Sequence, residues 1–157
     1  MVNNKKYHFK SAISVQVKYM TRIDPLTPEQ RKKTMQHVKD KDTGPEMTIR
    51  RLVHKMGYRY GLHRKDLPGK PDMVFTSRKK IIFIHGCFWH GHNCKSGRKK
   101  PRTNENYWVS KIEKNKKRDV INRKKLKEMG WNILVIWECE INDILKIKNK
   151  IEQFLNG

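Results

Sequence analysis

The 157-residue chain lacks the run of about 18 apolar residues that a membrane-spanning helix requires. Its apolar N-terminal stretch, residues 12–17, is interrupted by polar side chains, is too short for a signal peptide and is followed by no small-residue cleavage site. Cysteine is scarce: three residues, an odd number, indicate a reducing compartment and a metal or redox role rather than disulfides. Internal repeats are missing too. We therefore expect a cytoplasmic protein whose length suits one domain.

Acidic residues are also few. The chain has 15 Asp and Glu against 37 Lys and Arg, which gives a formal net charge of +22. A compact fold with this charge repels itself, so we expect an anionic partner, with nucleic acid first and an anionic membrane second. Since no membrane anchor is evident, the charge favours nucleic acid. The excess is densest in residues 95–125, which hold thirteen basic and three acidic side chains.

Turn and cap signals predict a short extension followed by one folded domain. Residues 1–19 keep no lasting hydrophobic period, and we expect them to be flexible or to precede the native start, so that the domain covers residues 20–157. Thr27 and Gln30 match a capping box, the signature of a helix start. Changes of hydrophobic period then define the expected elements: helices over 27–39 and 45–57, strands over 58–62, 72–76, 80–85 and 131–138, and helices over 104–129 and 144–155.

Two of the expected strands are apolar on both faces. The run at residues 81–84 and the segment 131–138 leave no polar face, which is typical of inner strands that are covered on both sides. Helices, strands, a long helix, a strand and a final helix follow one another in that order. This order predicts the α/β class, with a mixed central β-sheet flanked by helices on both faces.

The three cysteines gather near histidines. Cys87, His92 and Cys94 lie within eight residues, and Cys139 directly follows an expected strand. A Cys3His set is complete for tetrahedral structural zinc, which would brace the loop because no coordination position stays open for chemistry. The alternative is that these are small buried residues and a surface histidine, since free cysteine usually belongs to the core. The clustering favours the zinc site.

An acid and two imidazoles accompany two neighbouring strands. Asp72 opens one expected strand and His85 ends the next, as a divalent-metal phosphodiesterase requires, and such a metal neutralises the phosphate and activates water. His90 follows in the adjoining loop, and histidine is a natural base for that water. A turn residue after proline explains Asp72 equally well, and lone histidines are more often structural.

Aromatic residues lie close to these groups. Phe88 and Trp89 are in the same loop, and Trp108 is near the start of the basic helix. Such side chains usually belong to a core. Exposed beside a basic surface, they can instead wedge between base pairs and unstack them, which costs least at a mismatch.

Four motifs, taken in order, resemble the very short patch repair (Vsr) family of DNA mismatch endonucleases: DTGPE at residues 42–46, LPGKPD at 67–72, HGCFWH at 85–90 and WEC at 137–139. The resemblance implies a restriction-endonuclease-like fold and nicking of double-stranded DNA 5′ to the thymine of a T:G mismatch, which arises when 5-methylcytosine deaminates. It also implies a functional link to a cytosine-5 DNA methyltransferase and a repair polymerase. We expect a monomer, and the resemblance implies a location at the bacterial nucleoid.

The resemblance also implies residue roles. Asp72 and the backbone carbonyl of Ile84 would bind a catalytic Mg²⁺, His90 would activate the attacking water, and His85 and Glu46 would support the metal-bound water. The remaining candidates are the structural zinc ligands Cys87, His92, Cys94 and Cys139, the duplex wedge Phe88, Trp89 and Trp108, and, on the basic helix, the DNA-contacting cations Lys111, Lys114, Lys116, Lys117 and Arg118.

Two positions depart from the family pattern. Ile84 stands where some relatives have a hydroxyl residue, so a side-chain hydroxyl is lost while the backbone carbonyl remains. Gly91 stands where a relative can have a histidine, and we expect it to loosen the loop. Two other functions stay open: a restriction-like or defence nuclease with a different DNA target, and a non-catalytic, zinc-stabilised DNA-binding module.

The charge predicts a steep dependence of DNA binding on salt. With about 6–10 phosphate contacts, affinity should fall by roughly 10³–10⁵ between 50 and 200 mM salt, because each contact releases a condensed counterion. Titrating duplex DNA at several salt concentrations measures this slope. A flat response would mean that the basic helix does not follow the phosphate backbone.

Overall fold

The computed structural model describes residues 27, 29–30, 33, 41–62, 64–99 and 104–157. The expected extension, residues 1–19, and most of the expected helix over 27–39 lie outside this set. The capping box that predicts this helix is present: the Thr27 amide donates to Gln30 Oε1 at 2.9 Å, and the Gln30 amide donates to Thr27 Oγ1 at 3.2 Å. The helix-start signal is therefore confirmed.

Three strands form one mixed sheet in the order β1-β2-β3, with bounds Met73–Phe75, Lys80–His85 and Asn132–Trp137. β1 and β2 are antiparallel and are joined by a short 3-10 turn, η1 (Thr76–Arg78). β2 and β3 run parallel over all six residues of each strand. The predicted mixed sheet and the central place of β2 are confirmed.

Two strand predictions were wrong. β3 was expected to be an inner strand, but within the described sheet it lies at the edge. Its two apolar faces have another cause: Ile136 packs into one hydrophobic cluster and Ile133 against the other, so both faces are covered by helices. The strand expected over 58–62 reduces to one isolated bridge between Gly61 and Val74.

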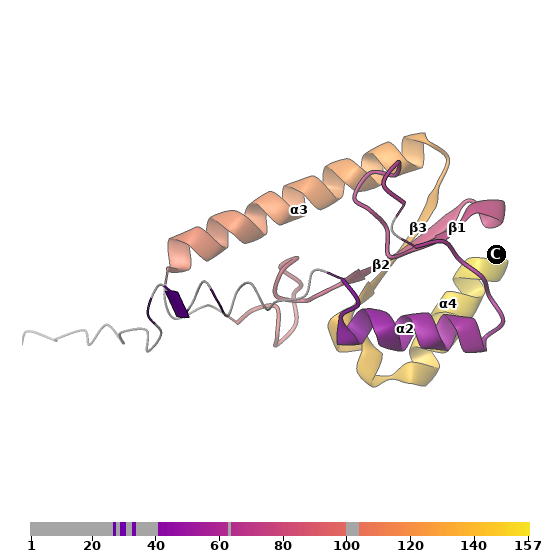
Figure 1. Cartoon of the computed structure of the whole chain (residues 1–157), viewed down its shortest axis with the longest axis horizontal. Helices are drawn as coiled ribbons and strands as arrows, with labels where there is room; N and C mark the ends of the chain where they lie inside the picture. Colours follow the sequence, from indigo (N-terminus) through magenta and orange to yellow (C-terminus); the bar gives the residue numbers. More distant parts are fainter. Residues whose placement is uncertain (1–26, 28, 31–32, 34–40, 63, 100–103) are drawn as a thin grey trace, which may run out of the picture.

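Helices cover both faces of the sheet, as predicted (Figure 1). α2 (Gly44–Lys55) and α4 (Ile144–Asn156) pack on one face, and α3 (Glu105–Glu128) lies on the other. The first face is the larger core and includes Ile49, Val53, Met73, Phe75, Ile82, Ile84, Ile136, Ile147, Ile151 and Leu155. The second contains Leu67, Val74, Ile81, Phe83, Leu126 and Trp131. Alternate residues of β2 thus enter opposite cores, which is the period-2 geometry of a strand.

Local signals set the ends of the helices that cover the first face. The Thr43 side chain accepts from the Glu46 amide, and proline occupies the first turn of α2. Gly57, with φ of +88°, follows the end of that helix. In α4 the buried stripe starts one turn later than its first apolar residues, because Ile147 is buried while Leu145 is 75% exposed.

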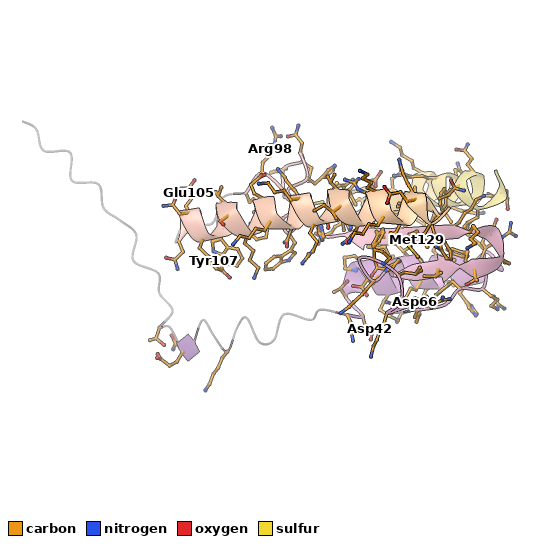
Figure 2. All side chains as sticks on the ribbon, turned by 90° about the horizontal axis from the view of Figure 1, so that it is seen from above. Asp42, Asp66, Arg98, Glu105, Tyr107 and Met129 are labelled. Carbon is orange, nitrogen blue, oxygen red and sulfur yellow. The ribbon has the colours of Figure 1, made fainter. Side chains whose placement is uncertain are left out.

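α3 meets the sheet near its C-terminal end. Among the described side chains of this helix, Leu126 alone is buried. Figure 2 shows the other end, labelled at Glu105 and Tyr107, extending away from the sheet. Val120 and Ile121 are exposed, so the apolar residues of this helix do not form one continuous buried stripe. None of the helices in the described part of the chain has the length and apolarity needed to cross a membrane.

Leu126 is therefore expected to anchor α3. Leu126→Ala should lower the free energy of unfolding by about 2–5 kcal/mol, because it removes a fully buried side chain and leaves a cavity. Denaturant unfolding measures this difference. The matched control is Ile121→Ala on the same helix, where the side chain is 53% exposed and the change should stay within about 0.5 kcal/mol. Equal losses in the two variants would contradict this anchoring.

Candidate active site and metal centre

A cavity of about 1100 Å³ lies between the start of α2, the end of β2 and one face of α3. It gathers side chains from five separate segments of the chain. Asp72 enters just before β1, His85 ends β2, and α3 contributes a row of polar residues. The five residues expected at the catalytic metal and water all line it: Glu46, Asp72, Ile84, His85 and His90.

Asp72 is held at the wall of this cavity by the neighbouring strand. Its Oδ2 accepts from the Ile84 amide at 2.7 Å, across the antiparallel β1–β2 pair. Loss of hydration raises the pKa of Asp72 to about 6, and the Ile84 hydrogen bond opposes this rise. A carboxylate offers several acceptor sites, so one bond to Ile84 leaves Asp72 able to bind a cation.

His85 and His90 lie face to face, with ring centroids 3.8 Å apart and planes 10° from parallel. Burial lowers the pKa of His85 to about 4, and the charge of His90 adds to this effect. His90 Nδ1 is 2.5 Å from Asp119 Oδ2 on α3. An acidic acceptor at Nδ1 favours the tautomer in which Nδ1 carries the proton and Nε2 is free to accept one.

Asp119 was missed by the sequence reasoning. Burial raises the pKa of this carboxyl, but the hydrogen bond to His90 and nearby positive charge outweigh burial, so the net shift is downward. One signal could have found it: Asp119 is an isolated acid in a strongly basic helix. Asn115 and Asn122 flank it at helical spacing, and all three side chains line the cavity.

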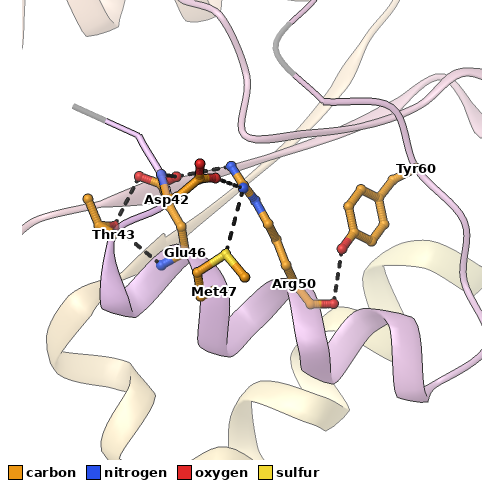
Figure 3. Close-up of polar contacts among 6 residues, drawn as sticks. All are labelled: Asp42, Thr43, Glu46, Met47, Arg50 and Tyr60. Atoms are coloured by element: carbon orange, nitrogen blue, oxygen red, sulfur yellow. Dashed lines mark hydrogen bonds and ion pairs between the residues drawn. The ribbon is translucent and has the colours of Figure 1, made fainter. Parts of the chain in front are cut away.

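Glu46 is also held in place by a set of hydrogen bonds, drawn in Figure 3. Its Oε1 accepts from the Thr43 hydroxyl at 3.0 Å, and its Oε2 accepts from the Asp42 amide and from Arg50, each at 3.0 Å. The side chain is 9% exposed. Glu46 therefore reaches the cavity in one fixed orientation.

The four expected zinc ligands come together where the loop after β2 meets the end of β3. One donor atom from each of Cys87, His92, Cys94 and Cys139 lies within 4.8 Å of all the others. Both Cys87 Sγ and Cys139 Sγ approach His92 Nδ1, at 3.7 and 3.4 Å. Three thiols and one imidazole converging in this way fit a tetrahedral metal ion.

Two contacts support this cluster. The Gly97 amide donates to Cys94 Sγ at 3.3 Å, which lowers the pKa of Cys94 to about 6 and favours the thiolate that binds metals. The His92 ring stacks on Trp137 with centroids 4.2 Å apart. Burial raises the pKa of Cys87 to about 12, so this thiol would need the metal's charge to ionise.

The expected wedge residues form one aromatic cluster next to the cavity. The rings of Phe88, Trp89 and Trp108 lie 5.2–5.6 Å apart, and all three side chains are half-buried. Tyr107 extends the cluster, and the Lys111 ammonium lies 5.7–5.9 Å from the rings of Trp89, Tyr107 and Trp108.

The five expected DNA-contacting cations divide into groups on α3. Lys111 and Arg118 line the cavity. Lys114 and Lys117 are exposed. Lys116 pairs with Glu113 at 3.1 Å. The structure thus brings two of the five to the candidate active site, together with Lys70 and Arg123, which the sequence reasoning did not include.

Comparison with known proteins agrees with these features. The family model described as DNA mismatch endonuclease Vsr matches residues 23–96. A type II nicking enzyme of Xanthomonas oryzae, V.XorIIP, is 46% identical over 133 residues, covering 85% of this chain and 97% of that protein. The Escherichia coli DNA mismatch endonuclease Vsr is 36% identical over 132 residues, covering 81% and 84%. The Neisseria meningitidis nicking enzyme V.NmeAIP is 39% identical over 120 residues, covering 76% and 85%.

The chain belongs to the Vsr family. The predicted family membership is therefore confirmed. The four Vsr motifs meet around the two sites: DTGPE and LPGKPD contribute to the cavity wall, HGCFWH contributes to both sites, and WEC supplies the last cysteine of the Cys/His cluster.

Gly91 marks a close approach of the loop to α3, and the expectation that this glycine loosens the loop stays a prediction. It has φ of +60°, and a Cβ built there would lie 2.9 Å from Ile112 Cγ2 and 2.3 Å from Lys116 Cε. A larger residue here would need both a strained backbone and a shift of the helix side chains. Gly91 thus permits a close approach of the loop to α3.

A second glycine should matter for metal binding. A Cβ at Gly97 would lie 2.0 Å from the His92 carbonyl oxygen, so Gly97→Ala must push apart the backbone that carries two cluster ligands. We expect the purified variant to hold less metal than the parent protein, measured by elemental analysis. Gly61→Ala is the control, because its nearest neighbour would be 3.8 Å away. Full metal content in Gly97→Ala would contradict this role.

Proposed function

We propose that this Vsr-family protein is an endonuclease that nicks double-stranded DNA 5′ to the thymine of a T:G mismatch by Mg²⁺-dependent hydrolysis. The observation that carries the proposal is the convergence of Asp72, His85 and the His90–Asp119 pair in one cavity beside an aromatic cluster. A non-catalytic DNA-binding module would leave this arrangement of acid and imidazole groups without a role.

Asp72 and the backbone carbonyl of Ile84 would hold the Mg²⁺. Oxygen donors suit this hard cation, and the two residues are already joined by a hydrogen bond at the cavity wall. When bound, the ion supplies charge that stabilises the phosphate in the transition state and makes water easier to ionise. Glu46 and His85 line the same wall and would orient water molecules there.

His90 would accept the proton of the attacking water at Nε2. Its Nδ1 faces Asp119, which fixes the tautomer and would stabilise the imidazolium that forms when the proton arrives. His85 stacks on the His90 ring and limits its rotation. Asp119 and the His85 ring would thus both fix the orientation of the His90 base.

The aromatic cluster would open the duplex. Phe88, Trp89 and Trp108 are half-buried and contact one another. Their side chains are therefore already restrained, and little conformational entropy would be lost when they insert together between base pairs. The cations of α3 would contact the phosphates on either side. A T:G pair is poorly stacked, so opening the duplex costs less there.

The Cys/His cluster would bind structural zinc. Its four protein donors leave no coordination position for water, so the ion would brace the loop and take no part in hydrolysis. Elemental analysis should return zinc in the purified protein, and chelation should loosen residues 86–99. Absence of zinc would contradict this part of the proposal.

The remaining expectations belong to the same proposal. They are a restriction-endonuclease-like fold, an endonuclease domain over residues 20–157, a monomer acting at the nucleoid, and a functional link to a cytosine-5 DNA methyltransferase and a repair polymerase. The relatives named as nicking enzymes support a single-strand cut. A nuclease with another target stays the alternative, and comparison of T:G, other mismatches and intact duplex distinguishes the two.

Asp72→Asn tests the catalytic assignment. The variant keeps the size of the side chain and its acceptor for the Ile84 amide, but it removes the charge that Mg²⁺ needs. We expect nicking of a T:G duplex to fall by about 10²-fold or more, with DNA affinity largely retained, because the loss concerns the chemical step. Single-turnover nicking and DNA titration measure the two effects. Nicking at the parent rate would remove Asp72 from the mechanism.

A further inference from the structure

Arg50 is a buried cation that the proposed mechanism does not use. It is 5% exposed and lies on α2, one turn after Glu46. Its guanidinium bridges two carboxylates, with Nη2 donating to Glu46 Oε2 at 3.0 Å and Nη1 donating to Asp42 Oδ1 at 2.5 Å (Figure 3). Met47 Sδ is 4.0 Å from the same Nη1.

Arg50 lies behind Glu46 as seen from the catalytic cavity. Glu46 lines that cavity, whereas Arg50 lines a neighbouring cavity of about 700 Å³ together with Asp42, Met47 and Tyr60. The Tyr60 hydroxyl donates to the Arg50 carbonyl at 3.1 Å and ties down this turn of α2. Arg50 is therefore placed to act on the site through Glu46, without meeting the substrate.

The contacts act twice on the same oxygen. Arg50 donates directly to Glu46 Oε2, and it also binds the side chain of Asp42, whose backbone amide donates to that oxygen at 3.0 Å. Asp42 has φ of +53°, a conformation that non-glycine residues adopt rarely, so a fixed side chain helps to hold it. Loss of Arg50 would loosen both bonds.

Stability gives a weak reason for arginine at this position. Its Nε is buried without a hydrogen-bond partner in the described part of the chain, which costs free energy. Replacing a buried ion pair by apolar residues of similar size is often neutral or stabilising. Arginine at this position orients Glu46 through a hydrogen bond, which a methionine or leucine could not donate.

We propose that Arg50 is a positioning residue, which holds the Glu46 carboxylate at the wall of the catalytic cavity from inside the protein. This inference rests on the proposed function, because it assumes that Glu46 orients water beside the Mg²⁺ ion. Groups that orient the direct ligands of a metal typically change metal affinity or activity by roughly 10–100-fold when they are removed. A similar loss is expected here.

The test is a double-mutant cycle between Arg50→Met and Glu46→Gln. Each variant is assayed for single-turnover nicking of a T:G duplex, DNA affinity, thermal unfolding, and binding of Mn²⁺ followed by loss of the free-ion electron paramagnetic resonance signal. Arg51→Met is the matched control, since it removes the same charge from the next, exposed residue of α2.

Arg50→Met should lower the nicking rate and the Mn²⁺ affinity by about 10-fold or more while DNA affinity changes little. In the Glu46→Gln background the same change should add less than about twofold, because residues that act as one unit are not additive. Arg51→Met should leave nicking within about twofold of the parent at saturating DNA.

Two results would overturn the inference alone: Arg50→Met as active as Arg51→Met while Glu46→Gln is impaired, or an undiminished Arg50 effect in the Glu46→Gln background. A protein that does not nick the duplex at all would instead overturn the proposed function, and this inference with it. Normal nicking by Glu46→Gln would remove Glu46 from the mechanism and overturn this inference, while the proposed nicking activity would stand. If Arg50→Met does not fold, Arg50→Lys enters the same cycle, because it keeps the charge but has no fork to join both carboxylates.

Discussion

The packing of the loop after β2 against α3 holds the candidate active site together. Three contacts make this joint: the His90–Asp119 hydrogen bond, the Asn115 amide that donates to the Trp89 carbonyl at 2.9 Å, and the close approach at Gly91. α3 is anchored to the sheet near its other end by Leu126. The helix thus has two attachment points, and its side chains between Lys111 and Arg123 line the cavity.

The same loop is tied to the sheet on its opposite side. The Cys87 amide donates to Glu138 Oε2 at 3.3 Å, and the Cys139 amide donates to Cys87 Sγ at 3.4 Å. Since β2 and β3 are parallel neighbours, their ends meet at one edge, and the loop that follows β2 starts beside the turn that follows β3. Cysteines 52 positions apart can share one ion for this reason. A short loop is thereby rigid enough to aim an imidazole.

Charge is arranged by role. Most lysines and arginines among the described residues are exposed, whereas four acids gather at the cavity. Glu46, Asp72, Asp119 and Glu138 all line it, among the cations Lys70, Lys111, Arg118 and Arg123. A polyanion would be attracted by the surface as a whole, and a divalent cation by the acids within. Hydrolysis of a phosphodiester needs both in one place.

Much of this protein follows from local pattern. The helix cap at Thr27, a helix that starts near Pro45, the central strand β2 and the mixed sheet were all predicted, because capping and hydrophobic period depend on near neighbours in the chain. The Vsr motifs likewise contain most residues that line the cavity and two of the four residues of the Cys/His cluster. Strand position was less accessible: β3 is apolar on both faces because helices cover it, and that pattern does not distinguish an edge from an inner strand.

Contacts between distant segments were decided by the tertiary structure. Asp119 stands out locally as an acid in a basic helix, but the sequence does not show that its partner is His90, 29 residues away. Nor does the sequence mark Gly91 as a point of close approach to α3. Arg50 looks like any helix arginine until two acids are seen to share its guanidinium. The amino-acid sequence by itself determined which chemical groups are present and the local elements that carry them. Which groups face one another depends on how those elements pack, and packing is a property of the whole chain.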